Sequence, residues 1–264
     1  MQNKAFRDLF ICYLEYIEVD LANSLINKTK FSKNVRLLDD FRNLFSYALN
    51  PSYVEEGNFA LKLQELQISI QTYKKDAENK LAISDKINLD LELITKFIIS
   101  NAEFNKQHAD FYLSNRNFSN AFKDSLINKD DFKDYTSLKL NNEDEQVFVQ
   151  SLLEFHNALS HLILVTCKNH LSTQDKNYRS AINHLYRATL DNYKIIIRFS
   201  LGRVQDNEDI LKAFISIREN EFLLLGEDLK NKKLDFYNPV LKIFEKTNIL
   251  EAYKLIYEAI KAIN

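Results

Sequence analysis

Residues 148–166 read FVQSLLEFHNALSHLILVT, and this stretch decides the fold. Apolar residues recur in it at alternating spacings of four and three, the period of a helix with one buried stripe. The stripe consists of Phe148, Leu152, Phe155, Leu159, Leu162 and Thr166. We therefore predict a long helix from about residue 143 to 170 that packs along a partner helix.

The same helical period recurs along the rest of the chain. Residues 59–77 repeat the alternation of four and three, and helical spacing also marks 5–27, 33–49, 84–111, 118–126 and 172–201. The chain has only 3 Gly and 2 Pro, which disfavours sheets joined by tight turns and excludes Gly-rich phosphate loops. These observations predict an all-α fold, a multi-helix bundle of long antiparallel helices with no sheet.

The polar, turn-like stretch 128–142 is the best candidate for a boundary between two units. It would separate an N-terminal helical region, 1–140, from a C-terminal helical bundle, 141–264, unless the two form one continuous domain. Within the second region, Ser172-Thr173 is expected to cap the helix that follows it. Asn238-Pro239 is read as a cap followed by proline at the first position of a helix.

Charge and composition narrow the class of protein. The formal net charge of −2 does not by itself predict a polyanionic partner, and 45% hydrophobic residues allow a sizeable core. Cys12 and Cys167 lie far apart in the sequence, as expected for free thiols in a reducing compartment. The beginning of the chain lacks the pattern of a signal peptide, and no apolar run is long enough to span a membrane. We expect a cytoplasmic protein without membrane association.

Polar residues that carry chemistry gather on the two helices 143–170 and 172–201. Glu154 and His161 follow helical spacing on the first, and His184 lies on the second. A short connection near 171–174 predicts that the two helices form an antiparallel hairpin, which would bring these side chains into one groove. The alternative is a solvated face with pairs of charges four residues apart.

The second of these helices contains Arg179-Ser180-Ala181-Ile182-Asn183-His184, an Arg-x4-His element. This element resembles the Arg-x4–6-His signature of HEPN domains, a family of helical ribonucleases and nucleotide-binding modules. The resemblance covers roughly residues 143–201 and includes the position of the motif on a late helix of a bundle. The residue after the arginine is often Asn, Asp or His in that family, whereas this chain has Ser180.

The resemblance implies a metal-independent RNA endonuclease of a bacterial toxin or antiphage defence system, with no cofactor. His184 would transfer protons between the RNA 2′-hydroxyl and the leaving oxygen, and Arg179 would hold the phosphate. The other residues expected to bind substrate are Glu154, His161, Arg187 and Lys194. Arg179 and His184 are five positions apart on one helix, so their side chains differ by about 140° in direction around the helix axis. We therefore expect a homodimer, in which a second chain completes the site, as the family implies.

Two other interpretations stay open at this point. His161, Glu154 and His184 could hold a divalent metal, although the chain has neither an HExxH nor a Glu-x-x-His pair. The chain could instead be a non-catalytic interaction, immunity or ligand-sensing subunit, whose regular apolar stripes extend into contacts with a partner protein. The sequence does not decide whether this protein is an enzyme.

Overall fold

A computed structural model describes residues 2–26, 34–53, 59–75, 81–86, 90–128, 132, 137–139, 146–166, 171–204, 207–224 and 230–263. Most of them are helical, as predicted. The helices are α1 (Gln2–Ile26), α2 (Val35–Leu49), α3 (Phe59–Lys75), α4 (Leu91–Ser100), α5 (Ala102–Lys123), α6 (Val149–Thr166), α7 (Lys176–Val204), α8 (Glu208–Leu223) and α9 (Ile249–Ile263). Short 3₁₀ turns occupy Pro51–Tyr53 and Ser84–Lys86. In this described part of the chain, no helix is both long and apolar enough to cross a bilayer.

The chain forms two compact units, each built from separate stretches of sequence. Unit 1 comprises Met1–Tyr112 and Val149–Leu185, and unit 2 comprises Leu113–Phe148 and Tyr186–Asn264. Helices α5 and α7 each contribute residues to both units. The boundary expected between residues 128 and 142 falls mostly on positions outside the described residues, and it stays a prediction.

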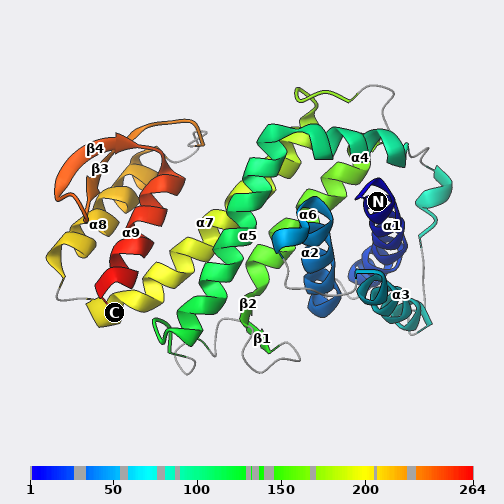
Figure 1. Ribbon diagram of the computed structural model, residues 1–264, viewed down its shortest axis with the longest axis horizontal. Helices are drawn as coiled ribbons and strands as arrows, with labels where there is room; N and C mark the ends of the chain where they lie inside the picture. The colour runs from blue at the N-terminus through cyan, green and yellow to red at the C-terminus, as the bar shows by residue number, and fades with distance from the viewer. Residues whose placement is uncertain are drawn as a thin grey trace. The chain divides into compact units, whose positions relative to one another are not determined.

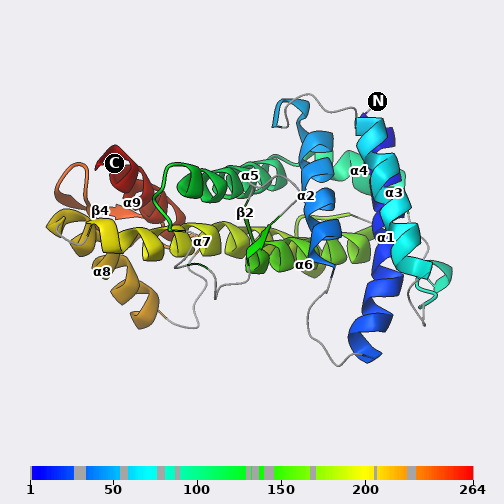
Figure 2. The same ribbon diagram turned by 90° about the horizontal axis from the view of Figure 1, so that it is seen from below.

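In unit 1, α1, α2 and α3 pack against one another, and α6 packs against α2 and α4 (Figures 1 and 2). Its core is aromatic: the ring of Phe45 meets Phe6 edge-on at 5.2 Å between centroids and Phe155 at 5.9 Å. The regular apolar stripe predicted for residues 59–77 is buried at Leu63, Leu66 and Ile70. These positions lie on one face of α3, which is why the spacing of four and three identified the helix.

The long helix expected over 84–111 is interrupted at Asn101. The side chain of Asn101 accepts a hydrogen bond from the backbone N–H of Phe104 at 3.0 Å, so it caps the start of α5. It also accepts a hydrogen bond from the hydroxyl of Tyr178 at 2.6 Å. Helix α5 then continues to Lys123, so it includes the first part of the segment expected to form a separate short helix at 118–126. The cap at Asn101 therefore ends α4 and starts α5, although the apolar spacing of the sequence continues from one helix into the other.

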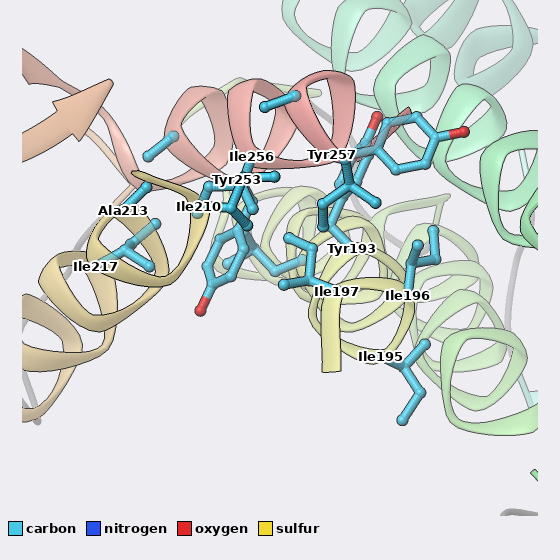
Figure 3. Packing of buried hydrophobic residues seen from close by; sticks show 14 of the residues in the cluster. Tyr193, Ile195, Ile196, Ile197, Ile210, Ala213, Ile217, Tyr253, Ile256 and Tyr257 are labelled. Atoms are coloured by element: carbon cyan, nitrogen blue, oxygen red, sulfur yellow. The ribbon is translucent and has the colours of Figure 1, made fainter. Parts of the chain in front are cut away.

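Unit 2 has its own hydrophobic core where α7, α8 and α9 meet (Figure 3). Tyr193 and Ile197 of α7 lie against Ile256 and Tyr257 of α9, and the rings of Tyr193 and Tyr257 are 5.7 Å apart. The buried face of α9 includes Ala252, Tyr253, Ile256, Ala259 and Ile260, which recur at helical spacing.

The prediction of a fold without a sheet was wrong. Two antiparallel pairs of strands occur among the described residues: β1 (Ser137–Lys139) with β2 (Gln146–Phe148), and β3 (Leu234–Asn238) with β4 (Ile243–Thr247). β2 occupies the place expected for the start of a helix near residue 143, and α6 begins only at Val149. β3 packs on α8 and α9, which bury Leu234 and Phe236 (Figure 1).

Asn238-Pro239 therefore begins a hairpin turn and does not begin a helix. The Oδ1 atom of Asn238 accepts hydrogen bonds from the backbone N–H groups of Val240 at 2.9 Å and Leu241 at 3.1 Å. The N–H of Lys242 donates to the carbonyl of Asn238, but Lys242 itself adopts a left-handed conformation with φ of 58°. One helical turn forms and is ended there, because a left-handed residue does not continue a right-handed helix.

Candidate active site

The candidate site lies where α6 and the first turns of α7 pair in unit 1. Asp175 precedes α7, and its side chain accepts hydrogen bonds from the N–H groups of Asn177 at 2.8 Å and Tyr178 at 3.3 Å. Asp175 is thus the cap of this helix, whereas the sequence had indicated Ser172-Thr173. The cap fixes where α7 starts and hence which of its side chains face α6.

His184 of α7 is held by Glu154 of α6. The Nδ1 atom of His184 lies 2.6 Å from Oε2 of Glu154, and the two side chains are only 14% and 12% exposed. An ionised carboxylate only accepts hydrogen bonds, so Nδ1–H of His184 is the donor. In the neutral ring the remaining lone pair is then on Nε2, which becomes the atom able to accept a proton.

His161 of α6 stacks on the same ring. The ring centroids of His161 and His184 are 5.1 Å apart and their planes differ by 22°. The Nδ1 atom of His161 lies 3.1 Å from Oδ1 of Asn177, so this imidazole is also held through Nδ1. The site therefore contains two adjacent imidazoles, each oriented by its own side-chain oxygen.

The two hydrogen bonds show that α6 and α7 run antiparallel here. Residue 154 faces 184 and residue 161 faces 177, a shift of seven residues forward on one helix and seven back on the other. Seven residues are about two helical turns, so both contacts fall on one face of each helix. Asn177 was missed in the sequence, although counting seven residues back from His184 would have identified it.

Arg179 is exposed on α7, five residues before His184. Its backbone N–H donates to the carbonyl of Asp175 at 3.0 Å, within the first turn of the helix. The helical angle of about 140° between these two positions sends their side chains in different directions. Arg179 is therefore open to solvent, while His184 faces α6.

The other two residues expected to bind substrate belong to unit 2. Arg187 is exposed on α7. The ammonium group of Lys194 lies 2.6 Å from Oε1 of Glu221 and 5.6 Å from the centre of the Tyr253 ring. The structure thus brings together Glu154, His161 and His184 from the predicted set, adds Asn177, and gives Lys194 partners of its own in unit 2.

Two other histidines are parts of the core of unit 1. His108 is fully buried among Phe45, Phe104 and Phe111, and this burial lowers its pKa to about 3. Nδ1 of His156 lies 3.0 Å from the hydroxyl of Tyr13, and burial also lowers the pKa of His156. His170 lies outside the described residues. Among the described residues, the histidines that the structure brings together at the candidate site are His161 and His184.

The stacked arrangement bears on the metal interpretation. Each Nε2 lone pair lies in the plane of its own ring, and the planes of the two rings differ by only 22°, so the two lone pairs lie in separate, nearly parallel planes. Among the described residues, no three His, Cys, Asp or Glu side chains form a group suited to a metal. The geometry suits proton transfer at two separate atoms better than chelation.

Comparisons with models of protein families, with curated proteins and with solved structures find no match to this chain.

Proposed function

We propose that this protein is a metal-independent RNA endonuclease of the HEPN-like type, acting through Arg179 and His184. The observation that carries the proposal is the hydrogen bond between Nδ1 of His184 and Glu154. A histidine whose tautomer is set by a carboxylate is the usual form of a proton-transfer group in catalysis. The bacterial toxin or antiphage setting implied by the resemblance is part of the same proposal.

In this reaction RNA supplies its own nucleophile, the 2′-hydroxyl group. His184 exchanges a proton with the reacting oxygens through Nε2, and Glu154 acts as a positioning residue that stabilises the imidazolium form. Arg179 points away from His184 of its own chain, so in this proposal the Arg179 of a second chain binds the scissile phosphate and offsets the charge that develops on it. A guanidinium group suits this role because it forms paired hydrogen bonds with phosphate oxygens. Arg187, which is exposed on the part of α7 that belongs to unit 2, is a further candidate for binding RNA phosphates.

The test is cleavage of a short single-stranded RNA in the presence of EDTA, with His184→Ala and Arg179→Ala as variants. We expect the wild-type protein to release fragments with a 2′,3′-cyclic phosphate, and both variants to lose this activity while keeping the wild-type circular dichroism spectrum. An RNA with 2′-deoxy nucleotides should not be cut. Undiminished cleavage by His184→Ala would refute the proposal.

A second candidate function, a non-catalytic interaction subunit, is favoured by one feature of unit 2. The hairpin of β3 and β4 exposes four apolar side chains that have more than half of their surface in solvent: Val240, Leu241, Ile243 and Phe244. Such patches are typical of protein interfaces. This alternative predicts a stable complex without turnover, and a Leu241→Asp/Phe244→Asp double variant should then lose the complex and leave the fold intact.

A further inference from the structure

We propose that His161 is the second proton-transfer group of the site, acting together with His184 in the same chain, and that Asn177 positions it. This inference rests on the proposed RNA endonuclease function. The sequence had suggested His161 only as a residue that binds substrate. Its contacts with His184 and Asn177 give it a more definite part.

The two rings have the same tautomer. Oδ1 of Asn177 accepts hydrogen bonds and does not donate them, so Nδ1–H of His161 donates to it, as Nδ1–H of His184 donates to Glu154. Both rings therefore keep Nε2 as the atom that exchanges a proton. Two unrelated side chains produce this same orientation in adjacent imidazoles, which is the arrangement that concerted acid and base catalysis needs.

Cleavage of RNA requires two proton transfers at different oxygens. In an in-line displacement at phosphorus, the attacking and the leaving oxygens lie on opposite sides of the phosphorus atom. One imidazole does not reach both oxygens at once, so a single histidine leaves one proton transfer to water. Two imidazoles with centroids 5.1 Å apart and nearly parallel planes supply two separate Nε2 atoms within one stacked pair.

The partners of the two rings suggest which one donates. The carboxylate of Glu154 stabilises a positive charge on His184, whereas the amide of Asn177 offers His161 a neutral acceptor. His184 accordingly donates the proton to the leaving oxygen, and His161 accepts the proton of the 2′-hydroxyl.

The step balances with the groups present. The 2′-hydroxyl proton passes to Nε2 of His161 as the O2′–P bond forms, and the P–O5′ bond breaks as O5′ takes a proton from Nε2 of His184. The products are a 2′,3′-cyclic phosphate and a 5′-hydroxyl end. Exchange with water then returns the proton from His161 and restores that on His184, so no metal, oxidant or reductant enters the balance.

The main experiment is the His161→Asn variant. The Asn side chain keeps an N–H near the position of Nδ1, so it retains a donor to Asn177, but it has no counterpart of Nε2. We expect the rate of RNA cleavage to fall by about 10²- to 10⁴-fold, the usual contribution of one acid or base. Asn157→Ala is the matched control, because Asn157 is exposed on α6 one turn before His161, and it should cleave at the wild-type rate.

A second substrate separates the two roles. Uridine 3′-(4-nitrophenyl phosphate) carries the same 2′-hydroxyl nucleophile, but its nitrophenolate departs without a proton. With this substrate we expect His184→Asn to recover most of its lost rate and His161→Asn to stay impaired. The reverse pattern would overturn the assignment of donor and acceptor.

Asn177 is tested through the pH profile. Replacement by Asp places a carboxylate beside His161 and favours its protonated form, so the limb of the profile on which the rate rises with pH should move to higher pH. A side chain that only supported the fold would change the rate without moving this limb. An unmoved limb in Asn177→Asp, with normal stability, would contradict the positioning role.

The outcomes also separate this inference from the proposed function. If the wild-type protein cuts RNA and His161→Asn cuts it equally well, the paired mechanism fails and the endonuclease assignment stands. If the protein reacts with the nitrophenyl diester in a His161-dependent way but cuts no RNA, the paired site stands and the endonuclease assignment fails. If neither substrate reacts, both fail.

Discussion

The ammonium group of Lys194 lies 2.6 Å from Oε1 of Glu221, and the hydroxyl of Tyr253 donates to Oε2 of the same carboxylate at 2.8 Å. Arg218 also bonds to it. The Glu221 side chain is only 12% exposed, so it ties α7, α8 and α9 together inside unit 2. Lys194, a residue expected to bind phosphate, thus already has a carboxylate partner.

From this contact we predict that Glu221→Ala destabilises the protein by about 2–3 kcal/mol, because it leaves the half-buried Lys194 ammonium and the Tyr253 hydroxyl without their acceptor. Lys194→Met should cost less, about 1 kcal/mol, since it removes the charge together with its need for a partner. Urea unfolding measures both.

The salt dependence of RNA binding should be the same in Lys194→Met as in wild type. A slope reduced by about one would instead show that Lys194 contacts a phosphate.

We predict that the folded protein is more stable when the carboxyl group of Asp40 is protonated than when it is ionised. Burial, with a contribution from neighbouring Asp39, raises its pKa from 3.8 to about 6. A carboxyl group whose pKa is higher in the folded state stabilises the fold below the unfolded pKa, and this contribution is lost as the pH rises through about 6. Asp40→Asn should therefore increase the free energy of unfolding on the order of 1 kcal/mol at pH 7 and have no such effect at pH 4. Glu219→Gln, an exposed acid on α8, is the control.

His108 has the opposite dependence on pH. Its pKa is lowered by burial from 6.5 to about 3, so the unfolded chain binds a proton at mildly acidic pH that the folded chain does not. Stability is then present above pH 6.5 and declines as the pH falls towards 3, by about 1.4 kcal/mol per pH unit for this one group. Between pH 6 and pH 4, the free energy of unfolding of His108→Phe should therefore fall less steeply than that of the wild type, by about 1.4 kcal/mol per pH unit. An identical slope in wild type and variant would show that His108 is already protonated in the fold.

The hairpin illustrates how far the sequence could predict the fold. Asn238 was read as a helix cap, and its side chain does accept hydrogen bonds from the N–H groups two and three residues ahead, as a cap does. Helix caps and tight turns share this local bonding, so the dipeptide Asn-Pro does not separate them. The packing of β3 against α8 and α9 decides in favour of strands, and no local pattern encodes that contact.

Only part of the candidate site was predictable, because local patterns determine the faces of the helices and not the contacts between them. Helical spacing placed Glu154, His161 and His184 on two paired helices, because periodicity determines faces. It did not determine the register between the helices, which depends on where the Asp175 cap starts α7. That start brings Asn177 opposite His161. The buried environments of His108 and His156 depend on contacts from distant segments, and helical periodicity does not encode these contacts.

We predict that Asn238→Ala destabilises unit 2 by about 1–2 kcal/mol. The substitution leaves the N–H groups of Val240 and Leu241 without their acceptor and removes the donor to Glu245, which lies 2.8 Å away. Glu245→Ala is the matched variant, since it keeps Oδ1 of Asn238 as the acceptor of the turn and removes only the partner of its Nδ2 group. It should be intermediate in thermal unfolding. Equal stability of wild type and Asn238→Ala would mean that the turn is held by strand packing alone.

The pairing of His161 and His184 within one chain makes a prediction about mixed dimers. If the chain dimerises, mixing His161→Asn with His184→Asn should restore no RNA cleavage, because neither chain then carries both rings. Mixing Arg179→Ala with His184→Ala is the contrasting experiment: if the exposed Arg179 acts on the site of the partner copy, about a quarter of the wild-type rate should return, from mixed dimers with one complete site. Recovery in the first mixture would show that the two histidines act from different chains, and would exclude the stacked pair as the unit of catalysis.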